Sequence, residues 1–119
     1  MPRSILFVDD NEALRNAGRL MLELAGYSIF EAGAGYQALD LVRSHEIDLV
    51  IADMDMPDMN GVELIQTLKD SHPPLKVIAM SDWFGDNETL SGVNATLSKP
   101  FSHTDLLSVV EKTISGDSP

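Results

Sequence analysis

The fold is decided by the stretch Ile5-Leu6-Phe7-Val8-Asp9-Asp10, in which four apolar residues lead into two adjacent carboxylates. Three later segments repeat this arrangement, with one run ending at Asp53, another at Ser81 and a third at Lys99. Short apolar runs of this kind are typical of strands that are buried on both faces of a parallel sheet. Because such sheets bind ligands at the carboxyl ends of their strands, the four segments predict a single site at that edge.

Strand-like and helix-like segments alternate along the chain, and the connections between them are short. The clearest helix start is at Ser102, which forms a variant of the capping box with Asp105, and Asn60 is expected to cap an earlier helix. This alternation predicts a doubly wound α/β fold, in which five parallel strands carry helices on both faces. We expect one domain over residues 1–119, with residues 116–119 as a tail.

The composition narrows the classes of ligand and partner. A formal net charge of −11 over 119 residues argues against direct binding to nucleic acid or to an anionic membrane surface. The same acidic excess suits a site for Mg²⁺ or Ca²⁺, or a basic protein partner. The chain has no cysteine, and it contains neither a signal-peptide pattern nor the roughly 18 consecutive apolar residues that a membrane-spanning helix needs. We therefore expect a cytoplasmic protein.

Three carboxylates, those of Asp9, Asp10 and Asp53, are expected to lie together where the first and third strands end. The structural alternative for Asp9 and Asp10 is interaction with the free N–H groups at the start of the next helix. Asp53 is harder to explain in this way, because an uncompensated charge at the end of a buried strand is costly. Clustered carboxylates repel one another unless a cation relieves them, and hard oxygen ligands suit Mg²⁺. A hydroxyl from Ser81 and an ammonium from Lys99 would suit a phosphoryl group beside that cation.

Together these segments resemble the receiver (response-regulator, CheY-like) domains of two-component signal transduction, over essentially the full length of the chain. The resemblance rests on residues 5–10, residues 53–61, Ser81, and residues 99–101. It implies a flavodoxin-like fold with the strand order 2-1-3-4-5, and a domain that catalyses only its own phosphorylation and dephosphorylation. By this resemblance Asp53 would accept a phosphoryl group from the phosphohistidine of a sensor histidine kinase or a phosphotransfer protein.

The resemblance also implies a set of magnesium ligands around the phosphoacceptor. Asp10 and Asp53 would bind Mg²⁺ directly, together with the backbone carbonyl of Asp55, and Asp9 would act mainly through water.

Two further residues would contact the phosphoryl group itself. Lys99 would bind it through the ammonium group, and Ser81 would turn inward to donate its hydroxyl. The family usually has a cis peptide bond after this lysine, so we expect a cis bond between Lys99 and Pro100.

Three features depart from the family pattern. Thr96 occupies the position where the family usually has a tyrosine or phenylalanine that acts as a rotamer switch, and Asp82 replaces the small residue that generally follows Ser81. The segment between Ser81 and the lysine is shorter than usual by about one helical turn, which predicts a shortened fourth helix. Trp83 and Phe84 lie in this segment, and we expect them to pack over exposed core or to form a partner-binding patch.

Other classes of function remain as alternatives at this point. A pseudo-receiver that is never phosphorylated would act purely as a protein-interaction module. A Mg²⁺-dependent phosphatase could use Asp53 as the nucleophile and Asp55 as the acid and base, but 119 residues leave no room for the cap that encloses its substrate. A flavodoxin-like FMN protein is disfavoured, since no phosphate-binding loop rich in Ser, Thr and Gly follows the first strand.

Overall fold

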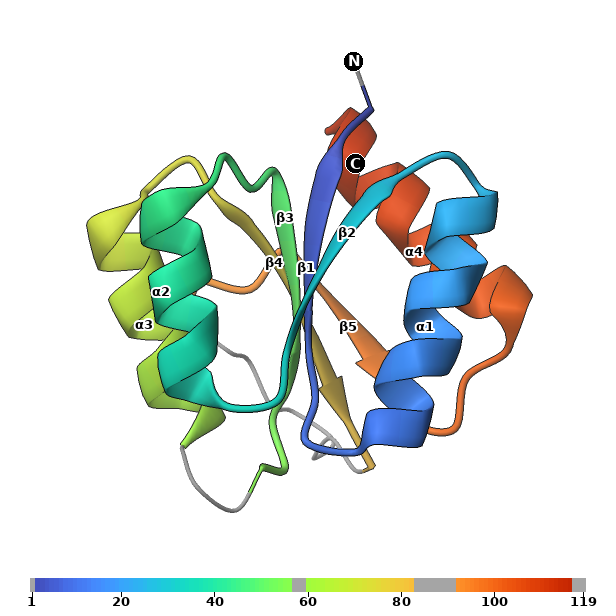
Figure 1. Ribbon diagram of the computed structural model, residues 1–119, viewed down its shortest axis with the longest axis horizontal. Helices are drawn as coiled ribbons and strands as arrows, with labels where there is room; N and C mark the ends of the chain where they lie inside the picture. The colour runs from blue at the N-terminus through green and yellow to red at the C-terminus, as the bar shows by residue number, and fades with distance from the viewer. Residues whose placement is uncertain (1, 57–59, 83–91, 117–119) are drawn as a thin grey trace.

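The computed structural model describes residues 2–56, 60–82 and 92–116 (Figure 1). Within them the elements follow one another in this order: β1 (Ser4–Val8), α1 (Glu12–Leu24), β2 (Ser28–Ala32), α2 (Gly35–Ser44), β3 (Leu49–Asp53), α3 (Gly61–Ser71), β4 (Lys76–Ser81), β5 (Ala95–Ser98) and α4 (His103–Ser115). All strand pairs are parallel, and their order is β2-β1-β3-β4-β5. The predicted α/β fold and strand order are confirmed.

Some of the sequence-based predictions fall outside the described residues. The shortened fourth helix and the arrangement of Trp83 and Phe84 concern residues 83–91, which are not described. The label α4 therefore belongs to the last helix of the chain, the one predicted to start after Ser102.

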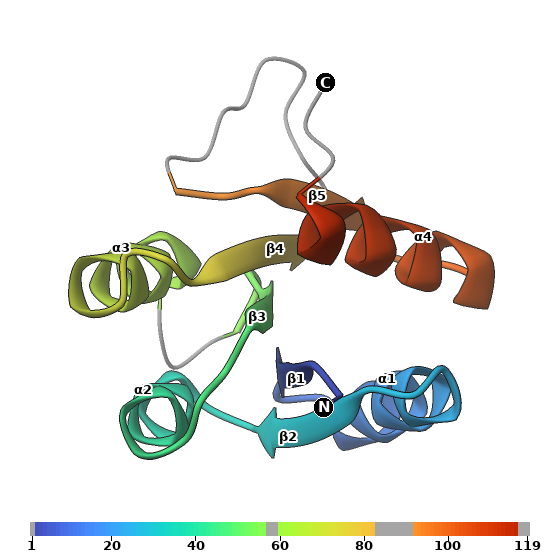
Figure 2. The ribbon, with the colours of Figure 1, turned by 90° about the horizontal axis from the view of Figure 1, so that it is seen from above.

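The helices form two layers, with α1 and α4 on one face of the sheet and α2 and α3 on the other (Figure 2). Along β1 the side chains alternate between these faces, because successive residues of a strand point in opposite directions. Ile5 and Phe7 pack in the cluster that includes α1 and α4, whereas Leu6 and Val8 pack in the cluster that includes α2. The two central strands β1 and β3 are consequently buried on both faces, which explains their unbroken apolar sequences.

The helix starts agree with the predicted caps. The Asn60 side chain accepts a hydrogen bond from the N–H of Val62, and Ser102 and Asp105 form a reciprocal capping box. At α1 the cap is Asn11, whose side chain accepts from the N–H of Leu14. The N-cap of α1 is thus neither Asp9 nor Asp10.

A close approach between α1 and β1 depends on a glycine. A Cβ atom added at Gly18 would lie 2.6 and 2.7 Å from two ring carbons of Phe7, which is completely buried. We expect Gly18→Ala to lower the free energy of unfolding by about 1–3 kcal/mol, because overpacking outweighs the better helix propensity of alanine. Urea denaturation measures this loss.

The matched control for this prediction is the double variant Gly18→Ala with Phe7→Leu, in which the ring that meets the new methyl group is gone. Its loss of stability should be smaller than the sum of the losses in the two single variants, since neighbouring residues that share one contact are not additive. Additive losses would show that the ring of Phe7 does not limit the space for a side chain at residue 18.

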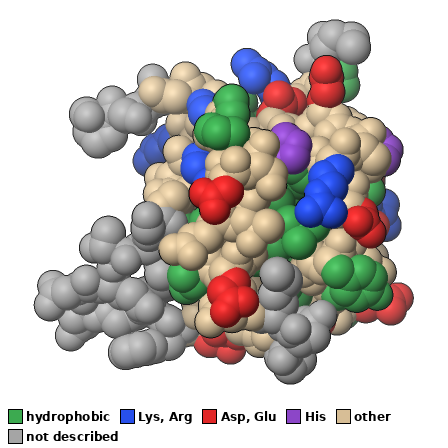
Figure 3. Space-filling view, turned by 90° about the vertical axis from the view of Figure 1, so that its left-hand side faces the viewer, with side chains coloured by type: hydrophobic (Ala, Val, Ile, Leu, Met, Phe, Trp, Pro, Cys, Tyr) green, Lys and Arg blue, Asp and Glu red, His purple; other side chains and the backbone are tan. Residues whose placement is uncertain are grey.

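A groove of about 740 Å³ lies at the edge of the sheet where the strands begin, and several basic side chains line it: Arg3, Arg43, His45, His72 and Lys76. Figure 3 shows the face that carries α2 and α3, with Lys, Arg and His side chains gathered in its upper half. These basic side chains lie at the opposite edge from the ends of β1 and β3. They cannot neutralise carboxylates there.

Candidate functional site

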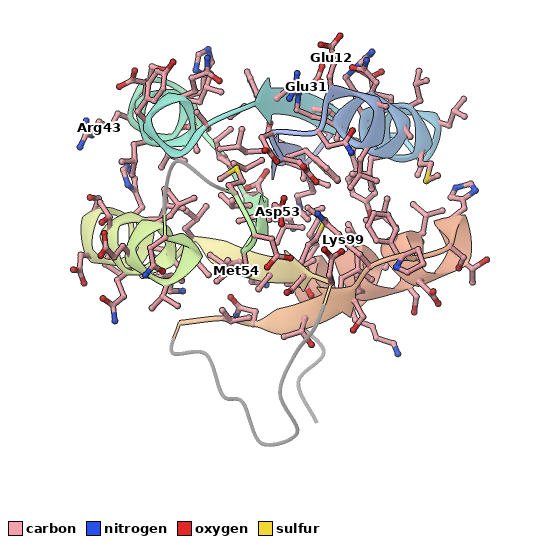
Figure 4. The ribbon with its side chains drawn as sticks, turned by 90° about the horizontal axis from the view of Figure 1, so that it is seen from below. Glu12, Glu31, Arg43, Asp53, Met54 and Lys99 are labelled. Atoms are coloured by element: carbon pink, nitrogen blue, oxygen red, sulfur yellow. The ribbon has the colours of Figure 1, made fainter. Side chains whose placement is uncertain are left out.

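The site lies where β1 and β3 end side by side, with Val8 paired to Ala52 in the sheet. The strand order reverses at this point, because the chain leaves β1 for an edge strand, β2, and returns to the other side of β1 as β3. A reversal of this kind opens a crevice at the carboxyl ends of the strands. Figure 4 looks onto that edge and shows the side chains of Asp53 and Lys99 pointing toward each other between the helix layers.

Three carboxylates meet in this crevice, as the sequence predicts. Asp9, Asp10 and Asp53 each offer one oxygen, and these three oxygens lie within 4.8 Å of one another. Asp9 is completely buried and Asp53 is 2% exposed, whereas Asp10 is open to solvent. Two buried acids and one solvent-facing acid form an all-oxygen donor set that leaves room for water on one side, which fits Mg²⁺.

Lys99 supplies the positive charge at the centre of the site. Its Nζ lies 3.1 Å from Oδ2 of Asp53 and 3.3 Å from Oδ2 of Asp9. Burial lowers the pKa of Lys99, but the hydrogen bond and charge of Asp53, followed by the charge of Asp9, outweigh burial and leave that pKa raised. The Lys99 side chain is therefore positively charged and is held in place by two carboxylates. The peptide bond between Lys99 and Pro100 is cis, as expected.

Asp9 is held by the backbone as well as by the lysine. Its Oδ1 accepts a hydrogen bond of 2.9 Å from the N–H of Asn11. Burial raises the pKa of Asp9; the hydrogen bond from Asn11 opposes this rise, the charge of Asp53 adds to it, and Lys99 also opposes it. Asp9 thus both accepts a hydrogen bond at the start of α1 and belongs to the acidic cluster. The sequence analysis had given these as two alternatives.

Ser81 and Asp55 meet beside the acidic cluster. The Ser81 hydroxyl donates to the two carboxylate oxygens of Asp55 at 3.1 and 3.3 Å. The N–H of Asp82 donates to Oδ2 of Asp55 at 2.9 Å, and the N–H of Asp55 donates to Oδ1 of Asp53 at 2.9 Å. Ser81 is therefore near the predicted phosphoacceptor, but its hydroxyl contacts the side chain of Asp55, a contact that the sequence analysis did not foresee.

The sequence analysis also missed an arginine pair that supports the site from α1. The Nη1 of Arg15 donates to the backbone carbonyl of Asp9 at 2.7 Å, and its Nε lies 3.2 Å from Glu31. Arg19 pairs with the other carboxylate oxygen of Glu31 at 2.8 Å. These contacts tie α1 to β2 and fix the peptide of Asp9. The available signal was the spacing of two arginines four residues apart, which places them on one face of a helix.

Gly61 allows the start of α3 to lie close to Met54. A Cβ atom at Gly61 would lie 2.9 Å from the Cα of Met54, which follows Asp53 in the chain. The start of α3 can therefore approach the backbone next to the predicted phosphoacceptor only because residue 61 has no side chain.

The comparisons with known proteins agree with this geometry. The family model of the response regulator receiver domain matches residues 5–111. The chain belongs to this family. The polar-differentiation response regulator DivK of Brucella anthropi is 35% identical to this receiver domain over 108 residues, which cover 86% of this chain and 88% of that protein. The sensor kinase CckA of Brucella abortus is 34% identical over 115 residues, 92% of this chain but 12% of that protein.

Solved receiver structures have the same fold. A CheY-like receiver domain protein from Methanospirillum hungatei superimposes with a TM-score of 0.92 at 25% identity, covering 98% of this chain and 96% of that chain. The response regulator TrrA from Thermotoga maritima, solved in complex with Mg²⁺ and BeF, has a TM-score of 0.86 at 29% identity, covering 93% and 98% of the two chains. Among the described residues of this receiver domain, no helix is both long and apolar enough to cross a membrane.

Removing one acid from the cluster of this receiver domain should change its response to Mg²⁺. We expect Asp10→Asn to stabilise the metal-free protein, because it relieves repulsion among the three carboxylates. In the wild type, Mg²⁺ at roughly a hundred times its dissociation constant should add about 2.7 kcal/mol of stability, and Asp10→Asn should lose most of that gain. Thermal unfolding with and without Mg²⁺ measures both effects.

The control for this experiment is Asp40→Asn, which removes the same charge from an exposed position on α2. It should keep the full Mg²⁺ shift. Equal Mg²⁺ shifts in the wild type and in Asp10→Asn would exclude Asp10 from the ligand set.

Proposed function

We propose that this receiver domain is a phosphoacceptor, in which Asp53 takes a phosphoryl group from the phosphohistidine of a sensor histidine kinase or a phosphotransfer protein. The observation that carries the proposal is the environment of Asp53: a buried strand-end carboxylate with the Lys99 ammonium at 3.1 Å and two further acids within reach of one cation. The complex of the Thermotoga maritima relative with Mg²⁺ and BeF supports it, since Mg²⁺ and BeF bind to a protein of the same fold.

In the proposed transfer a carboxylate oxygen of Asp53 attacks the phosphorus atom. The bond from phosphorus to the histidine nitrogen breaks, and its electron pair stays on that nitrogen. Lys99 would neutralise the charge on the phosphoryl oxygens, and the Ser81 hydroxyl would donate to one of them.

The proposed magnesium ligands are Asp10, Asp53 and the backbone carbonyl of Asp55, with Asp9 acting through water. When bound, Mg²⁺ would supply positive charge that offsets the repulsion between the carboxylates and the incoming phosphoryl group. Asp9 and Asp53 would keep their positions without rearrangement, because both already contact Lys99.

The relatives also indicate the class of partner. DivK is a response regulator of nearly the same length, and CckA is a sensor kinase that contains a segment similar to this chain. Both relationships support a histidine kinase or a phosphotransfer protein as the donor, and the proposal includes the cytoplasmic location expected from the sequence. No direct contact with nucleic acid or membrane is part of this proposal.

The test is uptake of a phosphoryl group from a small-molecule donor. The protein is incubated with acetyl phosphate or phosphoramidate in the presence of Mg²⁺, and the mass of the intact chain is measured. We expect a gain of one phosphoryl group that hydroxylamine removes, as it does from an acyl phosphate. Failure of both donors to add mass would favour the pseudo-receiver that acts only through protein contacts.

A further inference from the structure

The side chain of Asp55 joins the phosphoacceptor loop to the end of β4. Its two carboxylate oxygens accept the Ser81 hydroxyl at 3.1 and 3.3 Å, and Oδ2 also accepts the N–H of Asp82 at 2.9 Å. Its own N–H donates to Asp53 at 2.9 Å. One side chain thus holds both the hydroxyl and the following backbone amide, two residues away from the reacting carboxylate.

A serine hydroxyl has one proton to donate, and here that proton is directed at the two carboxylate oxygens of Asp55. The acceptor here is a carboxylate, and hydrogen bonds to an ionised group are shorter and stronger than those between neutral groups. Ser81 is 5% exposed, which limits replacement of Asp55 by water. A phosphoryl group on Asp53 would therefore have to compete with Asp55 for this hydroxyl.

We propose that Asp55 is a positioning residue: its carboxylate is a latch that holds Ser81 and the backbone of Asp82 in the resting arrangement and opposes the move of the hydroxyl to a phosphoryl group. This inference rests on the proposed function. The latch is distinct from the role of Asp55 as a magnesium ligand, since that role uses the backbone carbonyl and this one uses the side chain. It predicts that weakening the acceptor favours the phosphorylated state.

The first experiment titrates the protein with beryllofluoride at saturating Mg²⁺ and follows backbone amide signals by NMR. Asp55→Asn keeps the shape and the backbone of residue 55 but replaces the carboxylate by an amide. We expect it to bind beryllofluoride about tenfold more tightly than the wild type, which corresponds to about 1.4 kcal/mol. An unchanged or weaker affinity would overturn the latch.

Removing an acid near the site also removes general repulsion, so the charge effect needs its own control. Asp82→Asn removes the same charge from the neighbouring exposed residue and keeps the backbone N–H that Asp55 accepts. We expect the affinity of Asp82→Asn for beryllofluoride to rise by less than the affinity of Asp55→Asn. In a Ser81→Ala background the gain from Asp55→Asn should shrink to the size of this charge effect. An equal gain with and without the Ser81 hydroxyl would contradict the proposal.

The second experiment needs neither metal nor beryllofluoride. In the wild type we expect the Hα–Hβ couplings of Ser81 to report a single side-chain rotamer, because Asp55 holds the hydroxyl. Asp55→Asn and Asp55→Ala should average these couplings and shift the amide proton of Asp82 upfield, whereas Asp82→Asn should leave the Ser81 couplings unchanged. Averaged couplings in the wild type would exclude the latch.

The two experiments separate the latch from the proposed function. If the wild type does not bind beryllofluoride, the phosphoacceptor proposal loses its support, and the Ser81 couplings still decide whether Asp55 holds the hydroxyl. If the wild type binds beryllofluoride and the variants show neither the ordering of affinities nor the change in couplings, the function stands and the latch is wrong.

Discussion

The Asp53→Asn protein should take up no phosphoryl group from acetyl phosphate or phosphoramidate under conditions that phosphorylate the wild type fully. The reason is chemical, because an amide oxygen is a poor nucleophile and forms no stable phosphoryl compound, whereas a carboxylate forms an acyl phosphate. The Lys99 ammonium also lies 3.1 Å from Asp53, where it compensates the charge of this carboxylate. Mass measurement of the intact chain gives the result directly.

Two matched variants make this result specific. Asp55→Asn and Asp82→Asn each remove one negative charge near the site and leave the strand end of Asp53 intact. Both should still gain one phosphoryl group. A mass gain that persists in Asp53→Asn would place the acceptor on another residue and would remove the basis of the proposed function.

The second large effect concerns stability. Lys99→Met should lower the free energy of unfolding of the metal-free protein by about 3–5 kcal/mol, the usual cost of removing one partner from a buried ion pair. Lys99 contacts both Asp9 and Asp53, and its side chain is 15% exposed. Without the ammonium, two buried carboxylates face each other with no counter-charge. Urea denaturation in the presence of a chelator measures the loss.

The stability loss in Lys99→Met should depend on pH, and the pKa of Asp9 sets the direction of this dependence. Burial already raises the pKa of this carboxyl, and Lys99 is one of the groups that oppose the rise, so removing Lys99 raises the pKa further. A carboxyl whose pKa is higher in the folded than in the unfolded state costs stability as the pH rises through its folded value. The deficit of Lys99→Met should therefore be smaller at about pH 5 than at about pH 8.

Mg²⁺ provides the control for this prediction, because it should restore part of the lost stability by supplying positive charge to the same carboxylates. A conservative change at an exposed lysine, Lys112→Met on α4, should leave stability within about 0.5 kcal/mol of the wild type. If Lys99→Met behaved like this control at every pH, the two ion pairs would contribute nothing to the fold.

The parts of the fold that could be predicted depend on local patterns. The apolar run ending at Asp53 identifies a strand buried on both faces, and parallel pairing then carries that residue to the edge where β1 also ends. Asp9, Asp10 and Lys99 reach the same place for the same reason. Capping by Asn60 and Ser102 was equally visible, since these caps use residues within one turn of the helix.

The features that could not be predicted depend on the relative placement of whole elements. The contact of Arg15 with the carbonyl of Asp9 requires the rotation of α1 about its axis, which the sequence does not specify. The Asp55 side chain reaches Ser81 only because residues 54–55, directly after β3, lie beside the end of β4. For that reason the family resemblance implied a role only for the backbone carbonyl of Asp55, and its carboxylate had a role only in the phosphatase alternative.

The burial of β3 has a consequence for how the molecule fluctuates. Every residue from Leu49 to Asp53 is buried, and the strand is paired on both sides. Amide groups in such a strand exchange with solvent only through openings whose free energy approaches that of global unfolding, while exposed segments open far more often. The predicted acceptor is thus anchored in a part of the protein that opens last. Exposed segments can therefore open many times while the backbone of Asp53 stays paired in the sheet.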